Sequence, residues 1–378
     1  MRIYLDHNAT TPVRPEVVDA MSDVLRDGYG NPSSVYAEGA DARARVEGAR
    51  LQVAGLLGVD ASAIRFTGGA TESNNTILFG SLASGDHVVT TQVEHPSVVE
   101  PLAVLEAKGV EIDRILPDED GCVPPGELVA AIRNDTKLVS MIWANNETGS
   151  IQPVEDVAEV CATRGVPFHV DATQAIGKTS VDLSRVRVDF LSSSAHKLGG
   201  PKGVGALVSP TGMALPPLLH GGGQEKGLRG GTENVAGIVG YGLACELVAR
   251  EGAARAEAAR KLRDRLWEGI RKSVEAVRWN GGPERTLGNT LNVEFVGLAG
   301  EVLLQALDLE GVAISAGAAC HSGSIEPSKV LTAMGRTPEE ARASLRFSVG
   351  WGVDESQIDR VVALLGELVP RVRGTEAP

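Results

Sequence analysis

The chain is predicted to be an α/β protein with two domains. The larger is built on a mostly parallel seven-stranded sheet between helices, and the smaller is also α/β. Short β-rich runs alternate with helical patterns between residues 64 and 209, a long helical region follows, and strand and helix patterns return from residue 281. Because such alternation is typical of a parallel sheet covered by helices on both faces, these patterns together predict the fold class.

The large domain is predicted to span residues 14–250, and it begins with an alanine-rich helical stretch at 14–60. Its predicted strands are short runs rich in β-branched and aromatic residues. They are Ile64–Thr67, His87–Thr91, Glu111–Leu116, Leu138–Trp143, Phe168–Asp171, Phe190–Ser192 and Gly205–Ser209. Helical patterns lie between them at 71–82, 96–108, 124–133 and 153–164.

The small domain is predicted to combine residues 1–13 with residues 251–378. A long helical region at 234–277 joins it to the large domain, and the first dozen residues are expected to return to it. Its remaining elements are predicted at Thr290–Phe295, Glu301–Leu309, Ala313–Ser315, Glu339–Arg342, Ser344–Val349 and Glu355–Leu368.

Composition and charge exclude several classes of partner. The chain has 36 basic and 49 acidic residues and a net charge of −13, which argues against nucleic acid and anionic membranes, since both bind basic surfaces. No apolar run reaches the roughly 18 residues of a membrane span, and the N-terminus turns polar at once, so we expect a cytoplasmic protein. The spacing of the four cysteines predicts neither a disulfide framework nor a zinc or other metal site.

Lys197 is the first candidate functional residue. It ends the string Ser-Ser-Ser-Ala-His-Lys at residues 192–197, directly after a predicted buried strand. Such a lysine, with Ser194 and His196 beside it, suits pyridoxal phosphate. The amine can form the Schiff base with this cofactor, and the hydroxyl and imidazole can hold its phosphate.

Polar clusters follow the predicted strands one after another, at residues 68–74, 94–97, 145–149, 171–174 and 194–197. The carboxyl ends of the strands form the ligand crevice of an α/β sheet, so these clusters are expected to meet at one edge. Ala70 and Thr71 at a helix N-terminus are suited to phosphate, although Thr71 or Ser73 as an ordinary helix cap is the plainer interpretation.

Two further side chains fit the same cofactor. Asp171 is placed to pair with a protonated pyridine nitrogen, although a lone aspartate after a strand is more often a turn residue. His95 is suited to stacking on the ring and to moving protons, although a lone histidine before proline is more often a loop residue.

Together these residues resemble the class V branch of the fold-type-I pyridoxal-phosphate enzymes, and more closely the NifS/IscS-type cysteine desulfurases. The similarity runs from Tyr4 to Ser348, nearly the whole chain. The strings that carry it are Gly69-Ala70-Thr71-Glu72-Ser73, Val93-Glu94-His95-Pro96, Asn145-Asn146-Glu147, Asp171-Ala172-Thr173-Gln174, His196-Lys197 and Arg229-Gly230-Gly231-Thr232-Glu233-Asn234. The resemblance therefore implies the fold-type-I transferase fold.

The resemblance also implies a role for each matched residue. Lys197 would bind the cofactor and remove the substrate Cα proton, and His95 would stack on the ring. The other cofactor-binding residues would be Ala70, Thr71, Asn146, Asp171, Gln174, Ser194, His196 and, from the other subunit of a homodimer, Thr232. Asn146 and Arg346 would bind the substrate, with Arg346 clamping its carboxylate, although a plain sheet-edge arginine is the alternative.

Cys320 is the candidate catalytic thiol. It lies in a small, polar segment with two glycines nearby, which is typical of an exposed loop, and it matches the catalytic loop of the desulfurases. By contrast, Cys161 and Cys245 fall in helical patterns, and Cys122 follows an acidic turn that disfavours a thiolate.

The implied activity is conversion of L-cysteine to L-alanine, with the sulfur carried as a persulfide on Cys320. The sulfur would go to an acceptor protein such as an iron–sulfur scaffold or to tRNA thiolation. A selenocysteine lyase or other β-lyase, an aminotransferase and a non-catalytic scaffold are the alternatives. The presence of Lys197, Asp171 and Cys320 argues against the scaffold.

Overall fold

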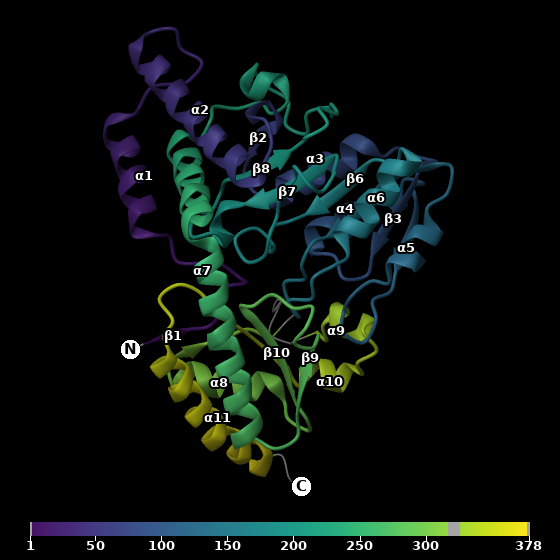
Figure 1. Ribbon diagram of the computed structural model, residues 1–378, viewed down its shortest axis with the longest axis vertical. Coiled ribbons are helices and arrows are strands. Elements are labelled where there is room, and N and C mark those ends of the chain that lie inside the picture. Colours follow the sequence, from purple (N-terminus) through teal and green to yellow (C-terminus); the bar gives the residue numbers. More distant parts are fainter. Residues whose placement is uncertain (1, 317–325, 376–378) are drawn as a thin grey trace.

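The computed structural model describes residues 2–316 and 326–375. The molecule has an upper and a lower half in Figure 1, and the long helix α7 (Val235–Ser273) runs along both. Both chain ends lie in the lower half. No helix within the described residues is long and apolar enough to cross a bilayer.

The upper half contains a seven-stranded sheet. Its strands, in spatial order, are β2 (Ile64–Thr67), β8 (Gly205–Val208), β7 (Phe190–Ser194), β6 (Phe168–Asp171), β5 (Thr136–Ile142), β3 (His87–Thr91) and β4 (Glu111–Ile115). Only β8 runs antiparallel to its neighbours, and the other neighbouring pairs are parallel. The predicted α/β fold with a mostly parallel sheet is confirmed.

The sheet has a hydrophobic core on each face, because successive strand residues point to opposite sides. Val88 and Leu138 join the core shared with α3 (Ala70–Ser81) and α4 (Pro96–Glu106), whereas their neighbours Val89 and Val139 join the other. That other core includes residues of α2 (Ala37–Leu57), α5 (Pro125–Ala131), α6 (Val154–Arg164) and α7. Helix α1 (Pro15–Asp27) lies against α7.

The lower half has its own core. An antiparallel sheet of β12 (Ser344–Ser348), β10 (Thr290–Phe295) and β9 (Val277–Asn280) lies beside a parallel pair, β1 (Ile3–Tyr4) and β11 (Val312–Ala313). The remaining helices are α8 (Gly300–Leu309), α9 (Lys329–Ala333), α10 (Pro338–Arg342) and α11 (Glu355–Thr375). Ile3 and Leu5 belong to this core, as do residues of α7, α8 and α11. The domain boundary placed between residues 250 and 251 falls inside α7 and stays a prediction.

The structure corrects three local expectations. The helical stretch predicted at 14–60 is two helices, separated by residues 28–36, where Gly28 ends α1 in a non-helical conformation. The helical region predicted to reach 277 ends at Ser273, because Val274 is extended and Ala276 has a positive φ of 49°. Strand β9 and helix α9 were not predicted.

Candidate active site

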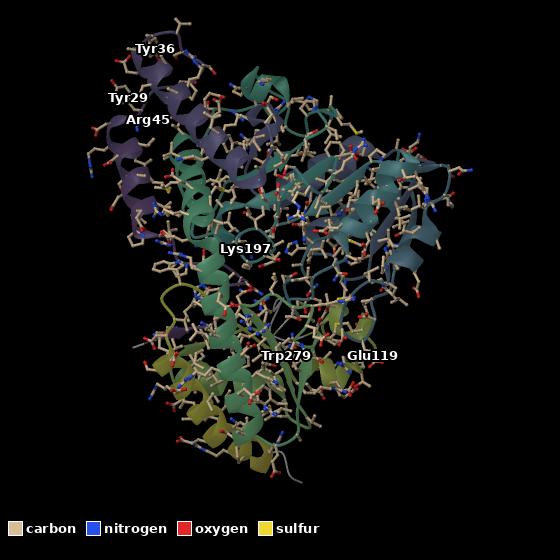
Figure 2. The ribbon with its side chains drawn as sticks, in the orientation of Figure 1. Tyr29, Tyr36, Arg45, Glu119, Lys197 and Trp279 are labelled. Carbon is tan, nitrogen blue, oxygen red and sulfur yellow. The ribbon has the colours of Figure 1, made fainter. Side chains whose placement is uncertain are left out.

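A cavity of about 940 Å³ lies at the carboxyl ends of the central strands. Most of the predicted site residues line it, whichever half of the chain they come from. They are Ala70, Thr71, His95, Asn146, Asp171, Gln174, Ser194, His196, Lys197 and Arg346. In Figure 2 Lys197 lies at the level where the two halves meet, beside α7.

Lys197 is held at the end of β7 by a short 3-10 turn, Ala195–Lys197. Its Nζ donates to the backbone oxygens of Asn8 and Ala9, the latter at 2.8 Å. Burial, and then the charge of Arg346, lowers the pKa of Lys197 to about 8. A substantial fraction of this amine is therefore unprotonated slightly above neutral pH, as a nucleophile or base requires.

An anion-binding cradle forms where β2 leads into α3. Helix α3 begins at Ala70, after Gly69 with φ +146°, and no side chain caps it, so the plainer interpretation of Thr71 or Ser73 as its cap is wrong. The first-turn amides of a helix have no intrahelical acceptors and favour an anion. Gly205 comes so close that a Cβ on it would lie 2.8 Å from Gly69 Cα, and Ser194 Oγ would lie 3.7 Å from a Cβ on Gly69.

Asp171 and His95 lie in the cavity wall at the ends of β6 and β3. The Asp171 carboxylate accepts hydrogen bonds from the Thr173 amide at 3.0 Å and the Asn74 side-chain amide at 2.8 Å. His95 is the N-cap residue of α4, where its Nδ1 accepts from the Ser97 amide at 3.1 Å. Burial lowers the pKa of His95, so the imidazole is neutral near neutral pH.

His196 and Gln174 are tied to the N-terminal segment. His196 Nδ1 lies 3.1 Å from Thr10 Oγ1, and burial followed by the charge of Lys197 lowers its pKa to about 4. Gln174 donates from Nε2 to the backbone oxygen of Asn8 at 2.8 Å. The N-terminal segment therefore forms part of the site wall.

Arg346 enters the cavity from the lower half. Although β12 is an edge strand, the side chain is only 5% exposed. Its Nη1 donates to the Asn146 backbone oxygen at 2.8 Å and its Nη2 to Asp6 Oδ1 at 2.6 Å. Its Nε is buried and has no partner within the described residues, and the side chain lines the cavity.

Two predicted residues are not part of this arrangement. Thr232 is exposed and does not line the cavity of its own chain. Cys320 lies outside the described residues. Cys122, Cys161 and Cys245 are all buried. Burial raises the pKa of Cys122 to about 11 and that of Cys161 to about 12, and it also raises that of Cys245, so these thiols are poor nucleophiles.

Two residues that the sequence analysis left without a role connect the site. Asn8 donates from Nδ2 to the Asn146 backbone oxygen at 3.1 Å and to Thr290 Oγ1 at 2.8 Å, so it joins the two halves. Its Oδ1 accepts from Lys178 Nζ at 3.1 Å, and Lys178 also contacts the Gln174 side-chain oxygen. In the sequence, only the positions of Asn8 and Lys178 within or near the matched segments pointed to these two residues.

The donor set fits pyridoxal phosphate. The backbone amides at the start of α3, beside Gly69 and Gly205, suit a phosphate. Ser194 and the neutral His196 suit the same group. Asp171 is a buried carboxylate suited to a pyridinium nitrogen, and Lys197 is an amine with a lowered pKa. The cavity thus offers complementary groups for each part of the cofactor.

Comparisons with known proteins agree with this geometry. The aminotransferase class-V family matches residues 3–361. A protein named cysteine desulfurase IscS from Methanosarcina thermophila is 43% identical over 375 residues, which cover 98% of this chain and 93% of that protein. Solved structures are similar to this chain as well.

A NifS-like protein superposes with a TM-score of 0.92 at 38% identity, covering 98% of this chain and 100% of that one. The structure named "SspA in complex with cysteine" has a TM-score of 0.82 at 35% identity, covering 93% of this chain and 99% of that one.

Proposed function

The chain belongs to the aminotransferase class-V family and, within it, to the pyridoxal-phosphate-dependent cysteine desulfurases, and on that basis we propose that it takes sulfur from L-cysteine, releases L-alanine and carries the sulfur on Cys320. The observation that best supports this is the single cavity in which Lys197, with its lowered pKa, and the incompletely paired Arg346 both lie. An amine and a carboxylate binder in one site suit an amino-acid substrate.

The residues that would hold the cofactor divide by its chemical groups. Ala70, Thr71, Ser194 and His196 would bind the phosphate, and Asp171 and Gln174 the ring nitrogen and ring oxygen. His95 would stack on the ring, with Asn146 nearby. When bound, pyridoxal phosphate supplies an electron sink that makes the substrate Cα proton and Cβ–S bond labile.

The substrate would be oriented by Arg346. A substrate carboxylate would bind the side of the Arg346 guanidinium that faces the cavity. Asp6 and the Asn146 backbone oxygen hold the same guanidinium in place. Lys197, once free and unprotonated, would take the Cα proton.

Cys320 would receive the sulfur. Its thiolate attacks the substrate sulfur, an S–S bond forms, and the C–S bond breaks with its electron pair left on the carbon fragment. That fragment takes up a proton and leaves as alanine, so an enzyme thiol and cysteine give an enzyme persulfide and alanine. The persulfide sulfur would then pass to an acceptor such as an iron–sulfur scaffold protein.

We also propose a cytoplasmic homodimer in which Thr232 reaches the partner's cavity. Thr232 is exposed and lies away from its own cavity, which supports this role. Tyr29 and Tyr36, which are 80% and 59% exposed, lie near each other at the upper edge of the molecule and are candidates for the interface (Figure 2). Light scattering of the purified protein would give its mass in solution, and a monomer would contradict this proposal.

The activity is tested on the purified holoenzyme. Its absorbance spectrum is recorded before and after addition of L-cysteine, and alanine and sulfide are assayed in the wild type and in Cys320→Ala. The proposal expects a yellow protein that makes both products and a variant that makes neither. Full activity in Cys320→Ala would indicate a lyase that does not need the thiol, and failure to bind pyridoxal phosphate would overturn the assignment of Lys197.

A further inference from the structure

A buried chain of hydrogen bonds joins Asp171 to His95 behind the cavity wall. Asn74 of α3 is fully buried, and its Nδ2 lies 2.8 Å from Asp171 Oδ2 and 2.8 Å from Ser97 Oγ. Ser97 Oγ in turn lies 2.7 Å from His95 Nδ1. Residues from α3, from the end of β6 and from the start of α4 therefore form one connected polar network.

The Ser97 backbone amide, which donates to His95 Nδ1 at 3.1 Å, decides which way the hydrogens in this chain run. The Asn74 amide nitrogen donates one hydrogen to Asp171 Oδ2 and its second hydrogen to Ser97 Oγ. Ser97 then donates its own hydroxyl hydrogen to His95 Nδ1, which also accepts from the Ser97 backbone amide at 3.1 Å. With two donors aimed at it, Nδ1 carries no proton, and the neutral ring has its hydrogen on Nε2.

The unpaired end of Asn74 supports this orientation. Asn74 Oδ1 is buried and has no hydrogen-bond partner within residues 2–316 and 326–375. Buried polar atoms without a partner are uncommon, because they lose their bonds to water without replacement. The Asn74 side chain leaves Oδ1 without a partner but uses both hydrogens of Nδ2. Donation to Asp171 and Ser97 therefore determines the orientation of its amide group.

We propose that Asn74 and Ser97 are positioning residues that hold His95 as the neutral Nε2–H tautomer and connect it to Asp171. The inference rests on the proposed function, in which His95 and Asp171 both touch the cofactor. Its consequence is that His95 offers the cavity a hydrogen-bond donor and no basic lone pair. Removal of the substrate proton is then left to Lys197.

The charged groups that face His95 are consistent with this assignment. Desolvation is the main cause that lowers the pKa of His95; Asp171 opposes it by favouring protonation of the imidazole, and Lys197 adds to the lowering. A second proton on Nδ1 would displace the hydroxyl and the backbone amide of Ser97 from their acceptor. The network therefore acts with burial to keep the ring neutral.

Nitrogen NMR of the holoenzyme labelled with ¹⁵N-histidine tests the tautomer directly. The His95 signals are identified by their loss in His95→Gln. We expect an unprotonated Nδ1 and a protonated Nε2 in the wild type at neutral pH. In Ser97→Ala and Asn74→Leu we expect mixed tautomers, and protonation of His95 at a higher pH than in the wild type.

Thr136→Val is the matched control. It removes a hydroxyl 2.8 Å from Nδ1 of a second histidine, the buried His87, at the opposite end of β3 from His95. The His95 signals should be unchanged in it. A second readout is the acidic limb of the kcat/KM profile, which should move to higher pH in Ser97→Ala and stay in place in Thr136→Val.

Two results would overturn the inference: a protonated Nδ1 in the wild type, or wild-type His95 signals in both Ser97→Ala and Asn74→Leu. These outcomes are separate from a failure of the proposed function. A wild type that makes no alanine from cysteine but shows the Nε2–H tautomer would refute the activity and leave the positioning role intact.

Discussion

Two half-buried lysines of the site, Lys197 and Lys178, both contact Asn8 and have lowered pKa values. Desolvation, and then the charge of Arg346, lowers the pKa of Lys197 to about 8, and desolvation followed by the charge of Lys197 lowers that of Lys178 well below its ordinary value. Lys178 is held by the side-chain oxygens of Asn8 and Gln174. A cation beside Lys197 favours its neutral, reactive form.

Attachment of the cofactor to the apoprotein should follow the titration of Lys197. With a pKa of about 8, the neutral fraction rises from about one tenth at pH 7 to about nine tenths at pH 9. The rate, followed by absorbance, is therefore expected to increase roughly tenfold over that interval and then level off. A rate that still rises steeply above pH 10 would mean that the amine is an ordinary lysine.

Glu94 should make stability depend on pH. Burial raises its pKa from 4.5 to about 8, and its Oε2 has no partner within the described residues. Between these values the folded carboxyl keeps a proton that the unfolded chain releases, so stability falls as pH rises, by at most about 1.4 kcal/mol per pH unit.

The variant Glu94→Gln removes this titration. Urea unfolding at pH 6 and pH 8 should show the variant gaining on the wild type as pH rises, since only the wild type loses its proton advantage. A difference in unfolding free energy that is the same at both pH values would show that Glu94 titrates normally in the folded protein.

The sequence identified the residues whose chemistry is explicit and missed those that act through contacts. Lys197, Asp171 and His95 were found from their chemistry and their positions after predicted strands, and Arg346 from the family resemblance, and all four line one cavity. Asn74 and Ser97 stood in the same clusters without a role, because the amide–hydroxyl–imidazole chain exists only after α3, α4 and β6 come together.

Among the secondary-structure elements, α2 is joined to the loop before α7 by a buried ion pair. Arg50 of α2 contacts Glu225 through two hydrogen bonds of 2.9 Å, and Glu225 also accepts from the Phe66 amide at 3.2 Å. Glu225 has a positive φ of 47°, an uncommon conformation that this pair helps to hold. The same loop leads to Thr232.

Arg50→Ala should destabilise the protein by about 3–5 kcal/mol, because it leaves the buried Glu225 carboxylate unpaired. Arg45→Ala in the same helix is the control, since the Arg45–Asp41 pair is exposed and such pairs contribute only about 0–1 kcal/mol. Chemical denaturation of both variants measures the difference. Equal losses would contradict a specific role for the buried pair.

Elements with strong local patterns were predicted well, and those set by tertiary contacts were not. Buried strands such as Ile64–Thr67 and Phe168–Asp171 agree at both ends, because a short apolar run between turn signals marks them. Strand β9, Val277–Asn280, carries mixed residues and is a strand because it pairs with β10. The sequence pattern did not reveal β9 because the strand begins only a few residues after α7 ends.

In the molecule as a whole, the N-terminal segment joins the upper and lower halves. Strand β1 lies in the lower half (Figure 1), where it pairs with β11. A few residues later Asn8 lies in the wall of the cavity. Asn8 contacts Asn146 above and Thr290 below, and its backbone amide donates to Ser348 Oγ at 2.9 Å. The relative position of Arg346 and the upper half depends on these bonds.

Asn8→Ala should therefore weaken both stability and substrate binding. Loss of its buried hydrogen bonds should cost about 1–3 kcal/mol in unfolding free energy, and KM for L-cysteine should rise because Arg346 is less well placed. Gln305→Ala, which removes an exposed amide from α8, should change neither quantity. An unchanged KM in Asn8→Ala would separate this segment from substrate binding.

Sulfur from L-cysteine is expected to be carried by Cys320. A single turnover of the holoenzyme with isotopically labelled cysteine, followed by mass spectrometry of the peptide containing Cys320, measures this transfer. We expect one added labelled sulfur atom on Cys320 and one alanine released per occupied site, with neither in Cys320→Ala. Alanine formed while Cys320 stays unmodified, or label on a buried cysteine instead, would contradict it.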